Sequence, residues 1–152
     1  MMGGLAKSID VLCWKEKANP IIIRVLPYIE KLNMAMESGT IESLVFAVRD
    51  LVKDDFQFLG ARRAIKNLPK CSDDEWKMAQ RSMLQCLKIY NVVMFFGMNL
   101  IQTVTRVANA HHDGETITAK EEKDLLVLRN AMIDNIKEAI RDWHVFLTWY
   151  QP

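Results

Sequence analysis

The stretch NVVMFFGMNLIQTV, residues Asn91–Val104, is apolar on almost every side of a helix, in a chain whose overall composition is typical of a soluble protein. Three environments accommodate such a segment: a membrane, the buried centre of a helical bundle, or a surface that a partner covers. The choice between these environments decides the fold.

A membrane-spanning helix needs about 20 consecutive, mostly apolar residues. The densest part of the stretch, Val92–Ile101, covers about half of that length and contains Asn99, and Arg106 follows it. Charged and amide side chains are costly in the core of a bilayer. We therefore expect no membrane span, and instead a helix that is surrounded by neighbouring helices of the same chain.

The two asparagines of this stretch, Asn91 and Asn99, need hydrogen-bond partners if the helix is enclosed. A buried amide that is left unpaired costs about 1–3 kcal/mol, whereas a paired one can fix the register of a bundle or of a dimer seam. The other possibility is that both side chains lie at the edge of the bundle and meet water. For Asn91 the edge position is the simpler expectation.

Hydrophobic residues recur three and four positions apart along most of the chain, and no segment shows the two-residue alternation of a strand. This spacing predicts helices at about 5–17, 20–36, 41–52, 56–68, 72–109 and 118–150. It leaves open whether 56–68 is a new helix or continues the one before it.

Prolines mark two expected interruptions of these helices. The residue before a proline is pushed away from helical geometry, so Asn19-Pro20 is expected to end one helix and begin the next. Pro27 also lies inside a helical pattern, where it should start a helix or kink it.

Side-chain caps mark the starts of the two longest helices. Ser72 with Glu75, and Thr118 with Glu121, each fit a capping box, in which a hydroxyl and a carboxylate bond the free amides of the first turn. Both of these helices should therefore begin sharply.

The two long helices are joined by a short polar turn, His111–Gly114, and are expected to lie antiparallel. The first would be roughly 55 Å long at 1.5 Å per residue, unless it bends near Gly97. The shorter helices then cover the remaining apolar faces. We therefore predict a single all-α domain over residues 1–152, a helical bundle of about five helices dominated by a long antiparallel helical hairpin.

The charge balance and the cysteines restrict the classes of function. The chain has 20 Lys and Arg against 19 Asp and Glu, a net charge of +1, whereas general polyanion binders carry a marked basic excess. Its three cysteines, Cys13, Cys71 and Cys86, form no C-x-x-C pair, which indicates reduced thiols in a cytoplasmic protein. The first residues lack the apolar core and the cleavage site of a signal peptide.

No signature of a nucleotide-binding site, a hydrolase or a familiar metal enzyme occurs in the sequence. We therefore expect no cofactor, and a non-enzymatic protein is the simpler interpretation. One cluster brings metal-ligand types together, although adjacent histidines in a glycine-containing loop are more often a solvated turn. This candidate metal site consists of His111, His112 and Asp113.

Positive charge gathers on one short stretch, which supports an alternative function in binding nucleic acid or phosphate. The helix dipole also explains basic residues near the end of a helix without any ligand. The candidate anion-binding residues are Arg62, Arg63, Lys66 and Lys70.

The C-terminal turns, DWHVFLTWYQP, carry more apolar residues than one helical stripe buries. Chain ends are usually frayed unless they are docked, and tryptophan is enriched at the centres of interfaces. The preferred function is therefore that of a non-enzymatic interaction or regulatory protein, which forms a homodimer or docks on a protein partner through apolar helix faces. The alternative is that Trp149 folds back over the end of the bundle. The candidate contact residues are Trp143, Phe146, Trp149, Tyr150, Met94 and Met98.

Overall fold

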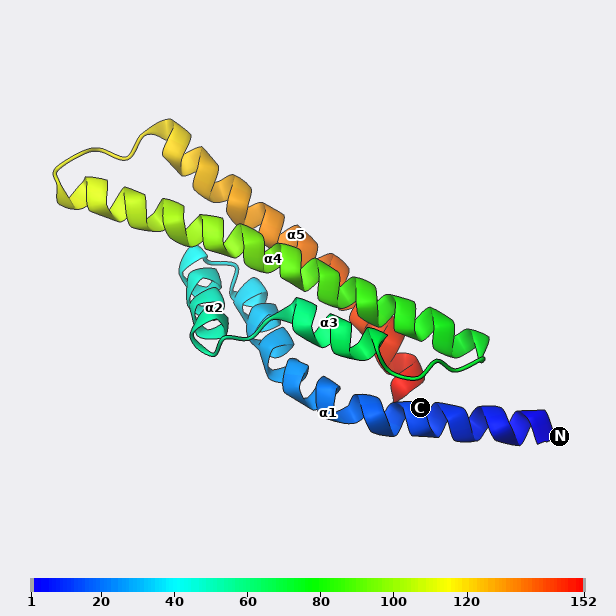
Figure 1. Ribbon diagram of the computed structural model, residues 1–152. Coiled ribbons are helices and arrows are strands. Elements are labelled where there is room, and N and C mark those ends of the chain that lie inside the picture. Colours follow the sequence, from blue (N-terminus) through cyan, green and yellow to red (C-terminus); the bar gives the residue numbers. More distant parts are fainter. Residues whose placement is uncertain (1, 152) are drawn as a thin grey trace.

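Five helices make up the part of the chain that the computed structural model describes, residues 2–151, with side chains described from residue 9 onward. They are α1 (Met2–Ser38), α2 (Ile41–Lys53), α3 (Phe58–Lys66), α4 (Asp74–His112) and α5 (Ala119–Tyr150). Figure 1 shows α4 and α5 side by side as a long hairpin, with the three earlier helices packed against it. The predicted all-α bundle with a dominant antiparallel hairpin is confirmed.

Helix α1 continues through both of its prolines, so the predicted break at Asn19-Pro20 is wrong. Pro20 and Pro27 both lie on its exposed side, where water can bond the carbonyl groups that a proline leaves free. The axis of α1 changes direction along its length in Figure 1, as is usual for a helix that contains proline. A continuous row of buried residues on the opposite side holds the helix against the bundle: Ala18, Ile22, Val25, Ile29 and Leu32.

Residues with a left-handed backbone mark the turns before and after α2, and the second turn shows that α3 is a new helix. Gly39 adopts a left-handed φ of 71°, and the Thr40 hydroxyl accepts a hydrogen bond from the Ser43 amide to begin α2. After α2, Asp55 also takes a positive φ, 54°, and the chain turns there before α3. The segment 56–68 therefore does not continue the preceding helix.

The two helices of the hairpin begin at side-chain caps. For α4 the cap is Asp73, whose carboxylate accepts from the Trp76 amide at 3.3 Å, so the helix does not begin at the predicted Ser72 cap. An aspartate caps as well as a serine does, and its charge also favours the positive end of the helix dipole. For α5 the predicted capping box of Thr118 and Glu121 is present.

Helix α4 is continuous from Asp74 to His112, without a break at Gly97 and past the predicted end at Asn109. Gly97 serves close packing instead of bending. A Cβ atom at this position would collide with the Val48 side chain of α2. The missing side chain therefore allows α2 to approach α4 closely.

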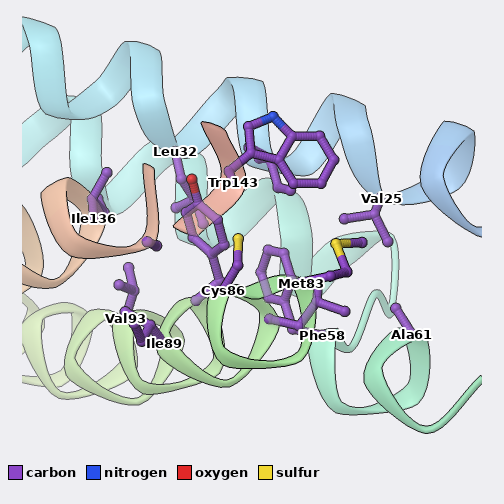
Figure 2. Close-up of a cluster of buried hydrophobic side chains, with 14 of the residues drawn as sticks. Val25, Leu32, Phe58, Ala61, Met83, Cys86, Ile89, Val93, Ile136 and Trp143 are labelled. Atoms are coloured by element: carbon purple, nitrogen blue, oxygen red, sulfur yellow. The ribbon is translucent and has the colours of Figure 1, made fainter. Parts of the chain in front are cut away.

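All five helices contribute buried side chains to the core, and Figure 2 shows a part of it where α1, α3, α4 and α5 meet. Phe58 of α3 stacks on Tyr90 of α4, with 5.3 Å between the ring centroids. The Tyr90 hydroxyl donates to the side-chain oxygen of Asn33 in α1 at 2.8 Å, and burial raises the pKa of this hydroxyl above its ordinary value. One tyrosine thus links three helices.

The turn end of the hairpin is less covered than the rest. Residues 111–120 are all exposed, and Figure 1 shows the turn extending beyond α2. A hydrogen bond ties α5 to the α1–α2 turn before this point, since the Arg129 Nε donates to the Gly39 carbonyl at 2.6 Å. Beyond that hydrogen bond the two helices of the hairpin depend mainly on each other.

Candidate interaction surface

One side of α4 faces away from the other described helices along most of its length. Residues on this side recur every three or four positions, and each of them is exposed or half-buried. The ends of the row are polar and basic, while its centre is apolar. We call this row the outer stripe of α4: Arg81, Gln85, Lys88, Val92, Phe95, Asn99, Gln102, Arg106 and Asn109.

The centre of the outer stripe exposes apolar side chains that the bundle does not cover. Phe95 is 65% exposed, and Met98 beside it is 39% exposed. Of the described helices, α4 alone is long and apolar enough to cross a membrane, and 39% of its apolar window is buried inside the bundle. The expectation that neighbouring helices surround this segment is therefore wrong on the outer side, because the other helices pack on the rest of its circumference.

Amide side chains border this apolar centre. Asn91 and Asn99 are both half-buried, and neither side-chain amide forms a hydrogen bond with another described residue. The neighbouring Thr103 hydroxyl is used inside the helix, where it donates to the Asn99 carbonyl at 2.9 Å. Both asparagines thus lie at the edge of the bundle, with amide groups that water or a partner can bond.

Two of the predicted contact residues are buried in the bundle and offer no surface to a partner. Trp143 is 5% exposed, and Phe146 is fully buried. They belong to a cluster that contains all four tryptophans, in which the Trp14 ring of α1 lies 6.2 Å from Trp76 and 5.6 Å from Trp149. Neither the Trp14 nor the Trp76 ring N–H has an acceptor among the described residues, so apolar packing holds this cluster together.

The last turn of α5 is docked on α1. The Lys15 ammonium lies 4.6 Å from the centre of the Trp149 ring and donates to the Trp149 carbonyl at 3.0 Å. The Tyr150 hydroxyl donates to the Asn19 side chain at 2.7 Å, and burial raises its pKa. Of the two predicted positions for Trp149, the structure shows the one folded over the end of the bundle.

A shallow groove of about 280 Å³ lies beside this end, between the start of α4 and the end of α5. Its exposed apolar residues are Met78 and Val145, and Trp149 also lines it. With Trp143 and Phe146 buried, the last turns of α5 expose fewer apolar side chains than the sequence suggests.

A cavity of about 530 Å³ lies between α1 and α3. Its volume falls within the range of small-molecule sites, roughly 300–1,000 Å³. Gly60 of α3 lines it, and a Cβ atom there would meet no other atom within 4 Å. The charged residues of its lining, Arg24 and Asp55, have opposite signs, so the cavity favours neither an anion nor a cation.

The candidate anion-binding residues differ in their surroundings. Arg62 of α3 is half-buried, and its Nε donates to the Leu84 carbonyl of α4 at 3.3 Å. Arg63 and Lys66 are exposed on α3, and Lys70 lies in the loop that follows. One of the four cations thus has a role within the fold.

The candidate metal residues lie at the exposed turn of the hairpin. His111 and His112 end α4, and Asp113 is its C-terminal cap. Among the described residues, no three His, Cys, Asp or Glu side chains come together as a group that could hold a metal ion. The predicted site of His111, His112 and Asp113 is therefore not assembled, because adjacent residues at a helix end point in different directions.

The three cysteines are free, with Cys13 exposed and Cys71 and Cys86 buried. Burial raises the pKa of both buried thiols, and the thiolate is the reactive form of cysteine. Thiol reagents should therefore modify Cys13 before the other two.

Comparison with protein-family models, with characterised proteins and with solved structures finds no match to this chain. Its own residues therefore have to indicate the function.

Phe95, the most exposed aromatic residue of those described, is missing from the contact residues predicted above, although the neighbouring Met94 and Met98 are included. The signal in the sequence is the seven-residue recurrence of Lys88, Phe95 and Gln102, which places these three side chains on one helical face.

Proposed function

We propose that this chain is a non-enzymatic helical protein that self-associates through the outer stripe of α4. The observation that carries the proposal is the 65% exposure of Phe95 in the middle of the most apolar stretch of the chain. Covering a phenylalanine side chain contributes roughly 1.5–3 kcal/mol. In a two-fold dimer each copy supplies that contribution once.

The polar residues around Phe95 support a protein partner in preference to a lipid one. Asn91, Asn99 and Gln102 border the apolar centre, and amide groups are costly in hydrocarbon. In a helix–helix interface the same groups can hydrogen-bond across the seam and fix its register. A cytoplasmic location also belongs to this proposal, because the three free thiols suit a reducing compartment.

The direct test is sedimentation equilibrium from about 1 µM to about 1 mM, which covers association free energies of roughly −8 to −4 kcal/mol. The wild-type mass should rise towards that of a dimer within this range. Phe95→Glu should remain monomeric, because it places two carboxylates at the centre of the interface.

The matched control is Val127→Glu, which makes the same kind of change at a 56% exposed position on α5, outside the outer stripe. This variant should dimerise as the wild type does, and circular dichroism should show both variants equally helical. A wild-type protein that stays monomeric at 1 mM, or a Phe95→Glu variant that still dimerises, would refute the proposal.

A further inference from the structure

We infer that two copies pair through their outer stripes in antiparallel orientation, with the two-fold axis passing beside Phe95. This inference rests on the proposed self-association and adds its geometry. In such a pair, a residue a given number of positions before Phe95 faces the residue the same number of positions after it in the other copy. The antiparallel pair therefore sets each residue of the outer stripe against the residue at the mirrored position in the other copy.

That comparison places each cation of the outer stripe opposite an amide. Lys88 stands seven positions before Phe95 and Gln102 seven positions after it. Arg81 and Asn109 have the same relation at fourteen positions. An ammonium or guanidinium group can donate to the side-chain oxygen of Gln or Asn, so these pairs are complementary.

The third cation fits the same register. Arg106 lies eleven positions after Phe95 and Gln85 lies ten before it, which places them opposite each other to within one residue, or roughly 1.5 Å along the axis. All three cations of the outer stripe therefore meet neutral hydrogen-bond acceptors in the antiparallel pair.

A parallel pair of the same stripes would be unfavourable. It would set Lys88 against Lys88 of the other copy, and likewise Arg81 against Arg81 and Arg106 against Arg106. Like charges that face each other across a helix–helix seam repel each other, and this repulsion disfavours the parallel dimer. The outer stripe contains no Asp or Glu that would relieve this repulsion.

The apolar centre is consistent with the antiparallel register. Phe95 meets its own copy at the axis, and Val92 faces Met98, since each lies three positions from Phe95. Asn99 then lies close to the axis in both copies, and its side-chain amide has no intramolecular partner among the described residues. Because Asn99 lies four positions after Phe95, it faces Asn91 of the other copy, four positions before Phe95, and the two side-chain amides can bond each other across the seam.

The self-complementary charge pattern is what favours a second copy over a different occupant. A foreign helix built for this face would have to be acidic or rich in amides at the spacings of Arg81, Lys88 and Arg106. The chain itself supplies acceptors at those spacings. An anionic membrane would attract the same cations, so it enters the test as an opposing outcome.

The orientation is tested by cross-linking in a Cys13→Ser background, because the two remaining native thiols are buried. Single variants Lys88→Cys and Gln102→Cys are each treated with a short bismaleimide, alone and as an equal mixture. The inference predicts that the mixture gives a covalent dimer joining one copy of each variant, while neither variant cross-links efficiently by itself.

A second measurement uses the charges directly. The double variant Lys88→Glu with Gln102→Lys would place the new carboxylate opposite the new ammonium in an antiparallel dimer, twice per dimer. Its dissociation constant should fall about 2- to 30-fold relative to the wild type. Lys88→Glu alone should not produce this gain.

The possible results separate the inference from the function on which it rests. A dimer in which Lys88→Cys cross-links to itself, or which the double charge variant weakens, would overturn the antiparallel geometry and leave self-association standing. A protein that stays monomeric at 1 mM would overturn both. Binding of monomers to vesicles of phosphatidylcholine and phosphatidylglycerol, abolished by Phe95→Glu, would replace the second copy by a membrane surface.

Discussion

The inner and outer faces of α4 both belong to the apolar stretch Asn91–Val104, yet the inner face packs against other helices and the outer face is exposed. On the inner face Gly97 and Leu100 are buried, and the Val48 side chain of α2 fills the space above the glycine. On the outer face Phe95 is 65% exposed. Hydrophobicity alone therefore does not tell which side of a helix forms the core, and small residues indicate close packing better than large ones do.

The largest expected effect is a loss of stability at the inner face. Leu100→Ala should lower the free energy of unfolding by about 2–5 kcal/mol, because Leu100 is fully buried and its removal leaves a cavity. Phe95→Ala removes a larger side chain from the outer face but should change monomer stability by less than about 0.5 kcal/mol. Urea denaturation, at a protein concentration too low for dimerisation, measures the free energy of unfolding of both variants. Equal losses of stability in Leu100→Ala and Phe95→Ala would contradict the assignment of the inner and outer faces.

The next effect adds volume to the inner face. Gly97→Ala should destabilise the protein by about 1–3 kcal/mol, because the new methyl group collides with Val48. Part of that loss should be recovered when Val48→Ala is added, which makes room for it. A double-mutant cycle in urea tests the contact, and strictly additive losses would mean that Gly97 and Val48 do not touch.

A second helical glycine provides the opposite case. Gly60 of α3 faces the cavity, where a Cβ atom meets nothing within 4 Å. Gly60→Ala should therefore raise the free energy of unfolding by about 0.5–1 kcal/mol, because alanine loses less backbone entropy in a helix. Thermal unfolding of the two alanine variants side by side should show shifts of opposite sign.

The smallest effect concerns a charge on α5. Burial, and secondarily the charge of Glu138, raises the pKa of Asp142 above its ordinary value of 3.8. The ionised carboxylate therefore costs stability above the raised folded pKa, and this cost disappears as the pH falls towards and below 3.8. Asp142→Asn should stabilise the protein slightly at pH 7, and its advantage should narrow on acidification. A constant advantage from pH 7 to pH 3 would rule out ionisation as the cause.

The sequence predicts those features whose causes are local. The hairpin follows from two long rows of apolar residues with a polar turn between them, and the capping box of Thr118 and Glu121 needs only four consecutive residues. The continuity of α1 through Pro20 and Pro27 depends on packing along its buried side, which no local rule contains. The role of Gly97 likewise depends on Val48, which lies in another helix.

The candidate surface is harder to predict for the same reason. Met98 could be predicted from the sequence because it lies in the stretch Asn91–Val104, which is apolar on almost every side of a helix. Trp143 and Phe146 looked equally available, but α1 packs over that end of the hairpin through Trp14. Which apolar residues remain exposed is decided by where the shorter helices come to lie, and those positions depend on long-range contacts.

The gathering of Trp14, Trp76, Trp143 and Trp149 at one end of the bundle has a consequence for spectroscopy. The intrinsic emission of this protein comes from a single neighbourhood, where α1 covers both arms of the hairpin. An emission shift will report the detachment of α1 or the fraying of the C-terminus. It will be silent about the opposite tip, where Asp113–Thr118 has no chromophore of this kind, so amide signals are needed to follow that end.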